Sequence, residues 1–247
     1  LPVYDETIIS SGDYNNLIFL HHSTGRNLIA EGDVRELLSE RGYLTAGMAG
    51  GPMCAANRGL AQGFASYRDP DTNETRADSM TDGAIAWLEA LGGETPFLFL
   101  NYFDPHYPYR APEAHWSPGQ EPLATTAGVP MTIGFLNEAM AEHGVLPPEL
   151  RRRLVAAYEA EVRFMDAQIG RLLCYLREAG HWEETIVAVT ADHGQGLQDH
   201  GWAKHRLLYQ EQIRVPLILR VPGARQQRVV GDLARTVDIA PTLFDYA

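Results

Sequence analysis

The strongest constraint on the fold of this chain is the alternation of short apolar runs with segments of helical period. Five runs have the length and composition of buried strands: residues 17–20, 43–48, 97–102, 185–190 and 215–220. Four segments carry apolar residues at spacings of three and four and are predicted as helices: residues 33–42, 79–91, 147–180 and 238–246. Asp33 and Asp238 are the predicted N-caps of the first and last helix. This alternation is typical of an α/β protein with a mostly parallel sheet flanked by helices.

Two segments lack both periods and are predicted as loops. Residues 49–77 are rich in Gly, Pro, Asn and Asp, and residues 103–147 are rich in proline. The second segment directly follows the strand 97–102, and we expect it to be a long surface excursion. Loops of this kind often line a functional site.

Composition narrows the function classes. The 20 Lys and Arg residues stand against 32 Asp and Glu residues, which gives a net charge of −12, and the basic residues are scattered along the chain. This balance disfavours nucleic acid as a partner. No run approaches the ~18 apolar residues that a membrane span needs. The two cysteines, Cys54 and Cys174, are too few for a disulfide framework or a cysteine-based zinc site.

The densest group of polar residues follows the strand 185–190. It begins with Asp192-His193-Gly194 and continues with His200-Gly201 and Lys204-His205. In open α/β sheets ligands bind at the carboxyl ends of the strands. A carboxylate and an imidazole there can ligate a divalent cation, and a lysine can approach an anionic substrate as a point charge. The alternative is a solvated turn in which Asp and Gly serve the backbone alone.

A second group, Asp104-Pro105-His106-Tyr107-Pro108-Tyr109, follows the strand 97–102. Prolines on both sides hold His106 in a restricted backbone, which suits a residue that meets an anion or a leaving group in fixed geometry. The alternative is an aromatic-proline corner that packs the loop onto the sheet.

Four motifs of the chain resemble those of the sulfatase family, in the family's order. Residues 96–109, PFLFLNYFDPHYPY, resemble its apolar strand with a D-P-H-x-P-Y turn, and residues 190–201, TADHGQGLQDHG, resemble its metal loop. Residues 204–223, KHRLLYQEQIRVPLILRVPG, and residues 236–244, TVDIAPTLF, resemble the two stretches that follow. The four motifs together are far more specific than any one of them.

The resemblance implies an alkaline-phosphatase-like α/β fold that hydrolyses sulfate esters of a small molecule or glycan. By analogy, Asp192 and His193 are ligands of one divalent cation, usually calcium in this family. Lys204 contacts the sulfate, and His106 lies near the ester oxygen as anion binder or proton donor. His200 is a further candidate for substrate binding, with a hydrogen-bonded loop histidine as its alternative role. A cation and Lys204 would neutralise charge on the transferring group, the dominant contribution in such reactions.

The chain also departs from the family pattern. The family carries two acidic metal ligands at the end of its first strand and a nucleophile in a Cys/Ser-x-Pro-x-Arg motif that becomes formylglycine. This chain has His21-His22 after its first strand, and no such motif occurs in its sequence. Cys54 and Arg58 have the separation of the Cys and Arg in that motif, but no proline lies between them. They also follow the segment 42–46, GYLTA, whereas in the family the motif precedes this segment. Ser23 is a possible nucleophile beside the imidazoles of His21-His22. Adjacent residues at a strand end point apart, however, so the local sequence alone gives no catalytic triad.

We therefore divide the chain into an atypical N-terminal segment, residues 1–33, and a partial sulfatase-like domain, residues 34–247. We expect this polypeptide alone to turn over sulfate esters very poorly. Two alternatives stay open: a phosphonate or phosphodiester hydrolase of the same superfamily, and a catalytically inactive relative that binds sulfated ligands.

Overall fold

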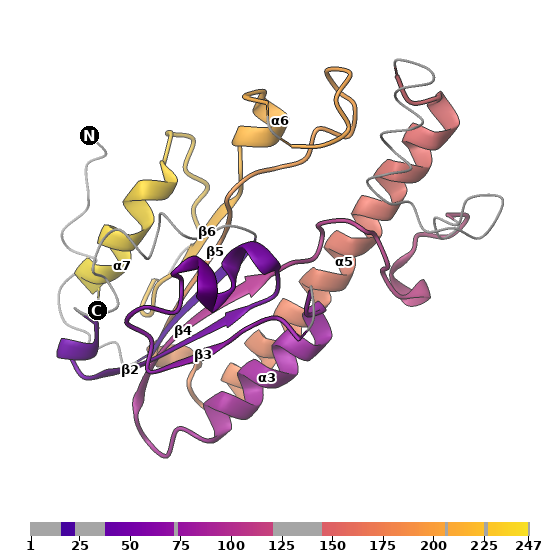
Figure 1. Ribbon diagram of the computed structural model, residues 1–247. Helices are drawn as coiled ribbons and strands as arrows, with labels where there is room; N and C mark the ends of the chain where they lie inside the picture. The colour runs from indigo at the N-terminus through magenta and orange to yellow at the C-terminus, as the bar shows by residue number, and fades with distance from the viewer. Residues whose placement is uncertain are drawn as a thin grey trace.

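The computed structural model describes residues 16–22, 38–71, 74–120, 145–205, 207–224 and 227–246. Within these ranges six strands form one sheet in the order β3-β2-β4-β1-β5-β6 (Figure 1). The strands are β1 (Asn16–His22), β2 (Tyr43–Ala49), β3 (Ser66–Arg68), β4 (Thr95–Tyr102), β5 (Thr185–Ala191) and β6 (Leu217–Arg220). Strands β1 to β5 pair in parallel, and β6 runs antiparallel beside β5 at the edge.

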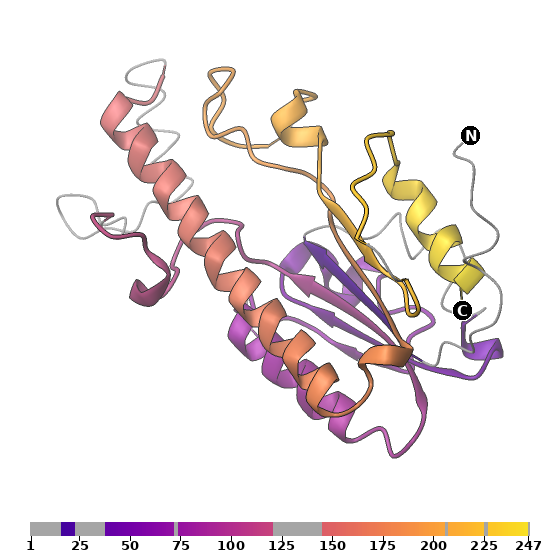
Figure 2. The same cartoon turned by 180° about the vertical axis from the view of Figure 1, so that it is seen from behind.

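Helices cover both faces of this sheet. The α-helices are α3 (Ala77–Glu89), α5 (Pro148–Glu178), α6 (Gln210–Ile213) and α7 (Ile239–Tyr246). Short 3-10 turns occupy Pro52–Cys54, Ala56–Arg58, Glu113–His115, Trp182–Glu184 and Thr236–Asp238. Helices α3 and α5 lie side by side on one face, and α7 lies on the other (Figures 1 and 2).

The alternation of side chains along β4 explains the three layers. Leu98 and Leu100 pack in the core formed with α3 and α5, whereas Phe97 and Phe99 pack with Ile239 of α7 and its neighbours. A strand with buried residues on both faces needs helices on both sides, as parallel sheets generally do. The predicted α/β class with a mostly parallel sheet flanked by helices is confirmed.

Most predicted elements are found within a few residues of their expected positions. This holds for the strands 17–20, 43–48, 97–102, 185–190 and 215–220 and for the helices 79–91 and 147–180. Of the helix expected at 33–42, the part before residue 38 lies outside the described residues. Within the described ranges, every helix is too short or too polar to span a bilayer.

Two details of the prediction were wrong. The segment 49–77 is not entirely loop, because it contains β3, which pairs with β2 at the sheet edge. Asp238 is not the N-cap of the last helical segment, because Arg235 occupies that position. The Asp238 carboxylate instead accepts hydrogen bonds from the backbone and side chain of Arg235, in a capping box.

The described part of the proline-rich segment, residues 103–120, is more buried than expected. Tyr107 and Tyr109 pack against Leu154 and Ala157 of α5. This observation supports an aromatic-proline corner, although the corner packs onto a helix and not onto the sheet. Residues 121–144 of the expected excursion lie outside the described residues.

Helix α5 buries two polar side chains in its apolar face. The buried residues are Leu154, Ala157, Ala160, Glu161, Phe164, Gln168, Leu172 and Leu176. The apolar residues Tyr158, Val162, Met165 and Ile169 recur at spacings of three and four in the middle of this helix, yet these four are only partly buried. The buried stripe is therefore rotated by one position there, which brings Glu161 inside.

Glu161 shares a hydrogen bond with Asp104, which follows β4 by two residues. Burial, together with the neighbouring Asp104 carboxylate, raises the pKa of Glu161 to about 8. Burial likewise raises the pKa of Asp104. At neutral pH the pair therefore holds one proton on Glu161, whose O–H donates to the Asp104 carboxylate.

This shared proton makes stability depend on pH in a defined direction. Between the pKa of an unfolded Glu and about 8, the folded chain retains a proton that the unfolded chain has released. The free energy of unfolding should fall as pH rises through this window, by up to about 1.4 kcal/mol per pH unit. We expect Glu161→Gln to remove that pH dependence. The free energy of unfolding of the variant, relative to that of the wild type, should therefore increase between pH 5 and 8.

Urea unfolding at several pH values measures this difference. Glu159→Gln is the matched control, because Glu159 lies on the same helix, is half exposed and pairs with Arg163 at 3.9 Å. Its curve should run parallel to that of the wild type. Parallel curves for Glu161→Gln as well would contradict the shared proton.

Candidate active site

The candidate site lies where three neighbouring parallel strands end. Strand β1 pairs with β4 on one side and β5 on the other, so that His21 is opposite Asn101 and Thr190, and His22 is opposite Tyr102 and Ala191. The residues that follow β4 and β5 therefore leave the same edge of the sheet. His21-His22, the last two residues of β1, therefore stand at that edge as well.

Asp192 and His193 continue directly from β5. The backbone N–H of His193 donates to Asp192 Oδ1 at 2.8 Å, and His193 Nδ1 donates to the Gly194 carbonyl at 2.8 Å. Because a carbonyl only accepts, this bond leaves the lone pair of the neutral ring on Nε2, which lies 3.7 Å from Asp192 Oδ1. Metal-binding histidines are commonly oriented by such a backbone carbonyl.

A narrow loop returns the chain from Asp192 toward the same edge. Gly196 N–H donates to the Lys204 carbonyl at 3.1 Å, and Gln198 N–H donates to the Trp202 carbonyl at 3.1 Å. A Cβ on Gly196 would lie 2.3 Å from the Trp202 carbonyl and 2.6 Å from that of Lys204. The two arms of the loop are this close only because position 196 has no side chain.

The returning arm brings His205 between the two predicted groups. The His205 ring stacks on the His193 ring with centroids 4.1 Å apart, and its centroid is 5.4 Å from that of His106. Gln195 orients His205 by a 3.1 Å hydrogen bond to Nδ1. The structure thus unites His106 with His193, although 87 positions of sequence separate them.

His106 is held by its own turn and by Phe103. Its ring stacks on the Phe103 ring at 4.5 Å, and Nδ1 donates to the Tyr107 carbonyl at 2.7 Å. Burial lowers the pKa of His106, and the nearby His193 lowers it further. The neutral ring therefore predominates at pH 7, with its lone pair on Nε2.

The other two predicted residues lie on the same loop in different settings. Lys204 is half-buried and is the only lysine in the sequence. His200 is about half exposed, its Nδ1–H donates to Glu211 Oε1 at 2.8 Å, and its ring stacks on that of Tyr209 with centroids 3.8 Å apart. His200 thus contacts the segment around α6, whereas His193 and His205 contact each other, and His205 also contacts His106.

Sequence reasoning missed two members of the site. The sequence motifs contain His205 only as the neighbour of Lys204, and Phe103 only as part of the strand-and-turn motif 96–109. The signal for His205 was its place among three histidines within thirteen residues, but no local pattern shows which of them turns toward another loop.

Within the part of the chain that the structure describes, no three or more His, Cys, Asp or Glu side chains are arranged to hold a metal ion. Cys54 is buried beside Ala49 and Leu60. Ser23 lies outside the described residues.

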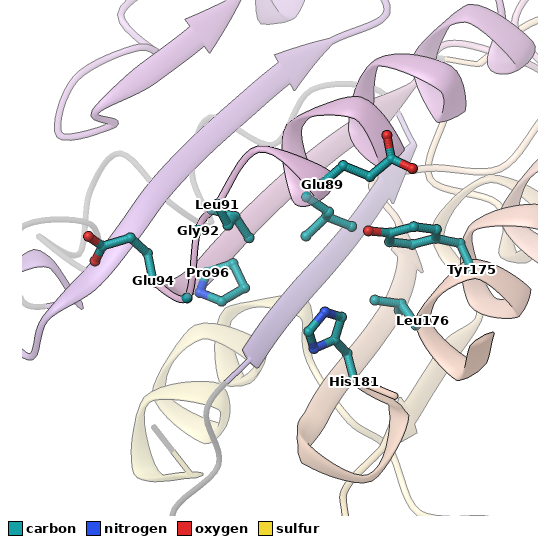
Figure 3. A pocket seen from close by; sticks show the side chains of 10 residues that line it. Glu89, Leu91, Gly92, Glu94, Pro96, Tyr175, Leu176 and His181 are labelled. Atoms are coloured by element: carbon teal, nitrogen blue, oxygen red, sulfur yellow. The ribbon is translucent and has the colours of Figure 1, made fainter. Parts of the chain in front are cut away.

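A separate cavity of about 250 Å³ lies at the opposite end of the strands, near the start of β4 (Figure 3). Its lining includes Pro96, at the start of β4, and His181, shortly before β5, together with Glu89, Glu94 and Tyr175. The candidate active site and this cavity share no lining residue.

Comparison with known proteins decides the family. The profile of the family described as Sulfatase matches residues 24–247. This chain belongs to the sulfatase family. An N-acetylglucosamine-6-O-sulfatase from Bacteroides thetaiotaomicron is 42% identical to it over 91 residues, which is 36% of this chain and 16% of that protein.

Solved structures confirm the expected alkaline-phosphatase-like fold. The phosphonate monoester hydrolase from Silicibacter pomeroyi matches with a TM-score of 0.65 at 22% identity, over 86% of this chain and 57% of that one. A protein in complex with its substrate D-glucosamine-2-N,6-O-disulfate matches with a TM-score of 0.60 at 22% identity, over 87% and 61%.

The chain matches less than half the length of its curated relatives. The matched part covers between 16% and 37% of each relative compared.

Two glycine substitutions test the loop geometry. Gly196→Ala should lower the free energy of unfolding by about 1–3 kcal/mol, because its Cβ meets two backbone carbonyls that must move. Gly170→Ala is the matched control: it lies inside α5 with open space around the new Cβ and should raise stability by about 0.5–1 kcal/mol. Urea unfolding measures both, and equal effects would contradict the close approach of the loop arms.

Proposed function

We propose that this sulfatase-family chain carries the cation-binding and substrate-binding part of a hydrolase acting on sulfate esters of small molecules or glycans. The observation that carries the proposal is the contact of His106 with the Asp192–His205 loop through His205. Two motifs that are far apart in sequence meet at one edge of the sheet, where α/β enzymes bind their ligands.

Asp192 and His193 fit a divalent cation as two of its ligands. One offers a carboxylate, and the other offers an Nε2 lone pair whose orientation is fixed by the Gly194 carbonyl. When bound, the cation would withdraw charge from the sulfuryl oxygens. Calcium is the cation that the family resemblance favours; an oxygen and an imidazole donor also suit zinc or manganese.

Lys204 and His106 act on the ester itself in this proposal. The Lys204 ammonium would bind the sulfate as a point charge in a half-buried position, where water screens the attraction less than at the surface. His106 would face the ester oxygen and, once the bound anion favours its protonated form, give a proton to the departing alcohol. His200 would contact outer parts of the substrate.

We further propose residues 34–247 as the sulfatase-like domain and residues 1–33 as an atypical N-terminal segment. The family match begins at residue 24, slightly before this boundary.

Two alternatives have specific support. The likeness in fold to a phosphonate monoester hydrolase favours a phosphonate or phosphodiester substrate. His21-His22 at the end of β1 favour a binding protein with an altered cation site, because the register puts these residues beside the ends of β4 and β5. Aryl sulfate and aryl phosphonate assays separate the first alternative from the main proposal, and ligand binding without turnover would favour the second.

The role of Lys204 predicts a loss of ligand affinity. Lys204→Ala should weaken binding of D-glucosamine-2-N,6-O-disulfate by about 10- to 100-fold, the range of a hydrogen bond to a charged group. Arg152→Ala is the matched control, because it removes one positive charge from an exposed pair with Glu149 on α5. Titration calorimetry measures both, and equal affinities in the two variants would refute a sulfate contact by Lys204.

The cation ligands predict a separate effect. Asp192→Asn and His193→Ala should each weaken binding of calcium or zinc at least tenfold, because each removes a donor from a small set. Asp199→Asn is the control, since Asp199 lies on the same loop but pairs with Arg151. Calorimetry with each metal checks this, and unchanged affinity in both variants would place the cation elsewhere.

A further inference from the structure

One buried carboxyl group holds both ends of the turn that carries His106. Glu161 lies in the middle of α5 and is only 3% exposed. Its Oε1 accepts a hydrogen bond from the backbone N–H of Arg110, and the same carboxyl group shares a hydrogen bond with Asp104. Residues 104 and 110 bracket His106, so one side chain fixes the turn on both sides of the imidazole.

The turn is fixed from other elements as well. The Asp104 carboxylate also accepts a hydrogen bond from the backbone N–H of Ala77, the first residue of α3. On the other side, the His106 ring rests on Phe103. A small cavity of about 20 Å³ is bordered by Asp104, His106 and Glu161 together, so the carboxyl pair and the imidazole line the same space.

The charges that face the pair explain why it keeps one proton. Arg76, at the N-cap of α3, is the cation that acts on both carboxyl groups. The Arg110 guanidinium is turned toward Glu74, at 2.6 Å. The Tyr109 phenol also faces Glu161, and burial raises its pKa, so it stays neutral. A single guanidinium offsets one negative charge, and a second carboxylate would repel the first.

We infer that Glu161 is a positioning residue for His106, which it holds by clamping residues 104 and 110 onto α5. The inference deepens the proposed function, because His106 is the group proposed to meet the ester oxygen. Loss of the shared proton sets two carboxylates against each other, weakens the bond to Asp104 and releases the turn. The clamp therefore works below a pH of about 8, the pKa of Glu161.

The test follows the His106 ring itself in the full chain labelled with ¹³C-histidine, with no ligand present. The His106→Gln variant assigns the signal. Above pH 7 the His106 ring is already neutral, because burial lowers its pKa, so a further change in its NMR signal reports on its surroundings. We expect an inflection near pH 8 in the wild type, and a signal that stays flat from pH 7 to 10 in Glu161→Gln, whose amide makes the same two bonds without a titrating proton.

Glu161→Ala should shift or broaden the His106 signal at every pH. Glu159→Gln, the control on the same helix, should keep the wild-type inflection. A Glu161→Gln protein that folds and still shows the inflection overturns the inference, and this outcome can be read even if Glu161→Ala does not fold.

Ligand binding separates this inference from the proposed function. If only the clamped form binds, the affinity of the wild type for D-glucosamine-2-N,6-O-disulfate should fall roughly tenfold from pH 7 to pH 9, and that of Glu161→Gln should not. The expected NMR result without any binding of the sulfated sugar would leave the clamp standing and refute the function. Binding with the same pH dependence in both proteins would refute the clamp alone.

Discussion

The parallel pairing of β1 with β4 and β5 is the interaction on which the rest of this structure depends. The backbone ladder sets His21-His22 level with Asn101-Tyr102 on one side and Thr190-Ala191 on the other. All three strands therefore release their next residues at one edge. This register explains why the candidate residues after β4 and those after β5 lie at the same end of the sheet.

Close backbone approach then converts that edge into a site. Position 196 must be glycine for the two arms of the Asp192–His205 loop to lie together. Gly51 plays a similar part beside β4, because a Cβ there would lie 2.3 Å from the Phe103 ring on which His106 rests. The placement of the candidate side chains thus depends on glycine at positions 51 and 196.

The strands and the longest helix could be predicted because their residues satisfy one period each. The segment from Phe97 to Leu100 is apolar on both faces, which indicates a buried strand. The candidate histidines His106 and His193 could be proposed from their motifs and their places after strands. His205 could not, because its orientation depends on a hydrogen bond that its Nδ1 donates to Gln195 Oε1 and on the His106 ring from another loop.

The burial of Glu161 could not be predicted from the sequence, for a different reason. A pattern that counts apolar residues places a glutamate on the solvent side of a helix, and here the helix buries it. Only the position of Asp104 and the Arg110 backbone, 51 or more residues away, makes that burial favourable. Interactions of this kind arise from tertiary packing and leave no mark in the local sequence.

We propose that the ends of β4 and β5 form one ligand site. A crystal structure of the chain grown with a divalent cation and D-glucosamine-2-N,6-O-disulfate tests it most directly. We predict a cation within about 2.0–2.6 Å of the Asp192 carboxylate, with the sulfate in hydrogen-bond reach of both Lys204 and His106. A sulfated sugar that binds away from this edge, or that contacts neither residue, would contradict the account.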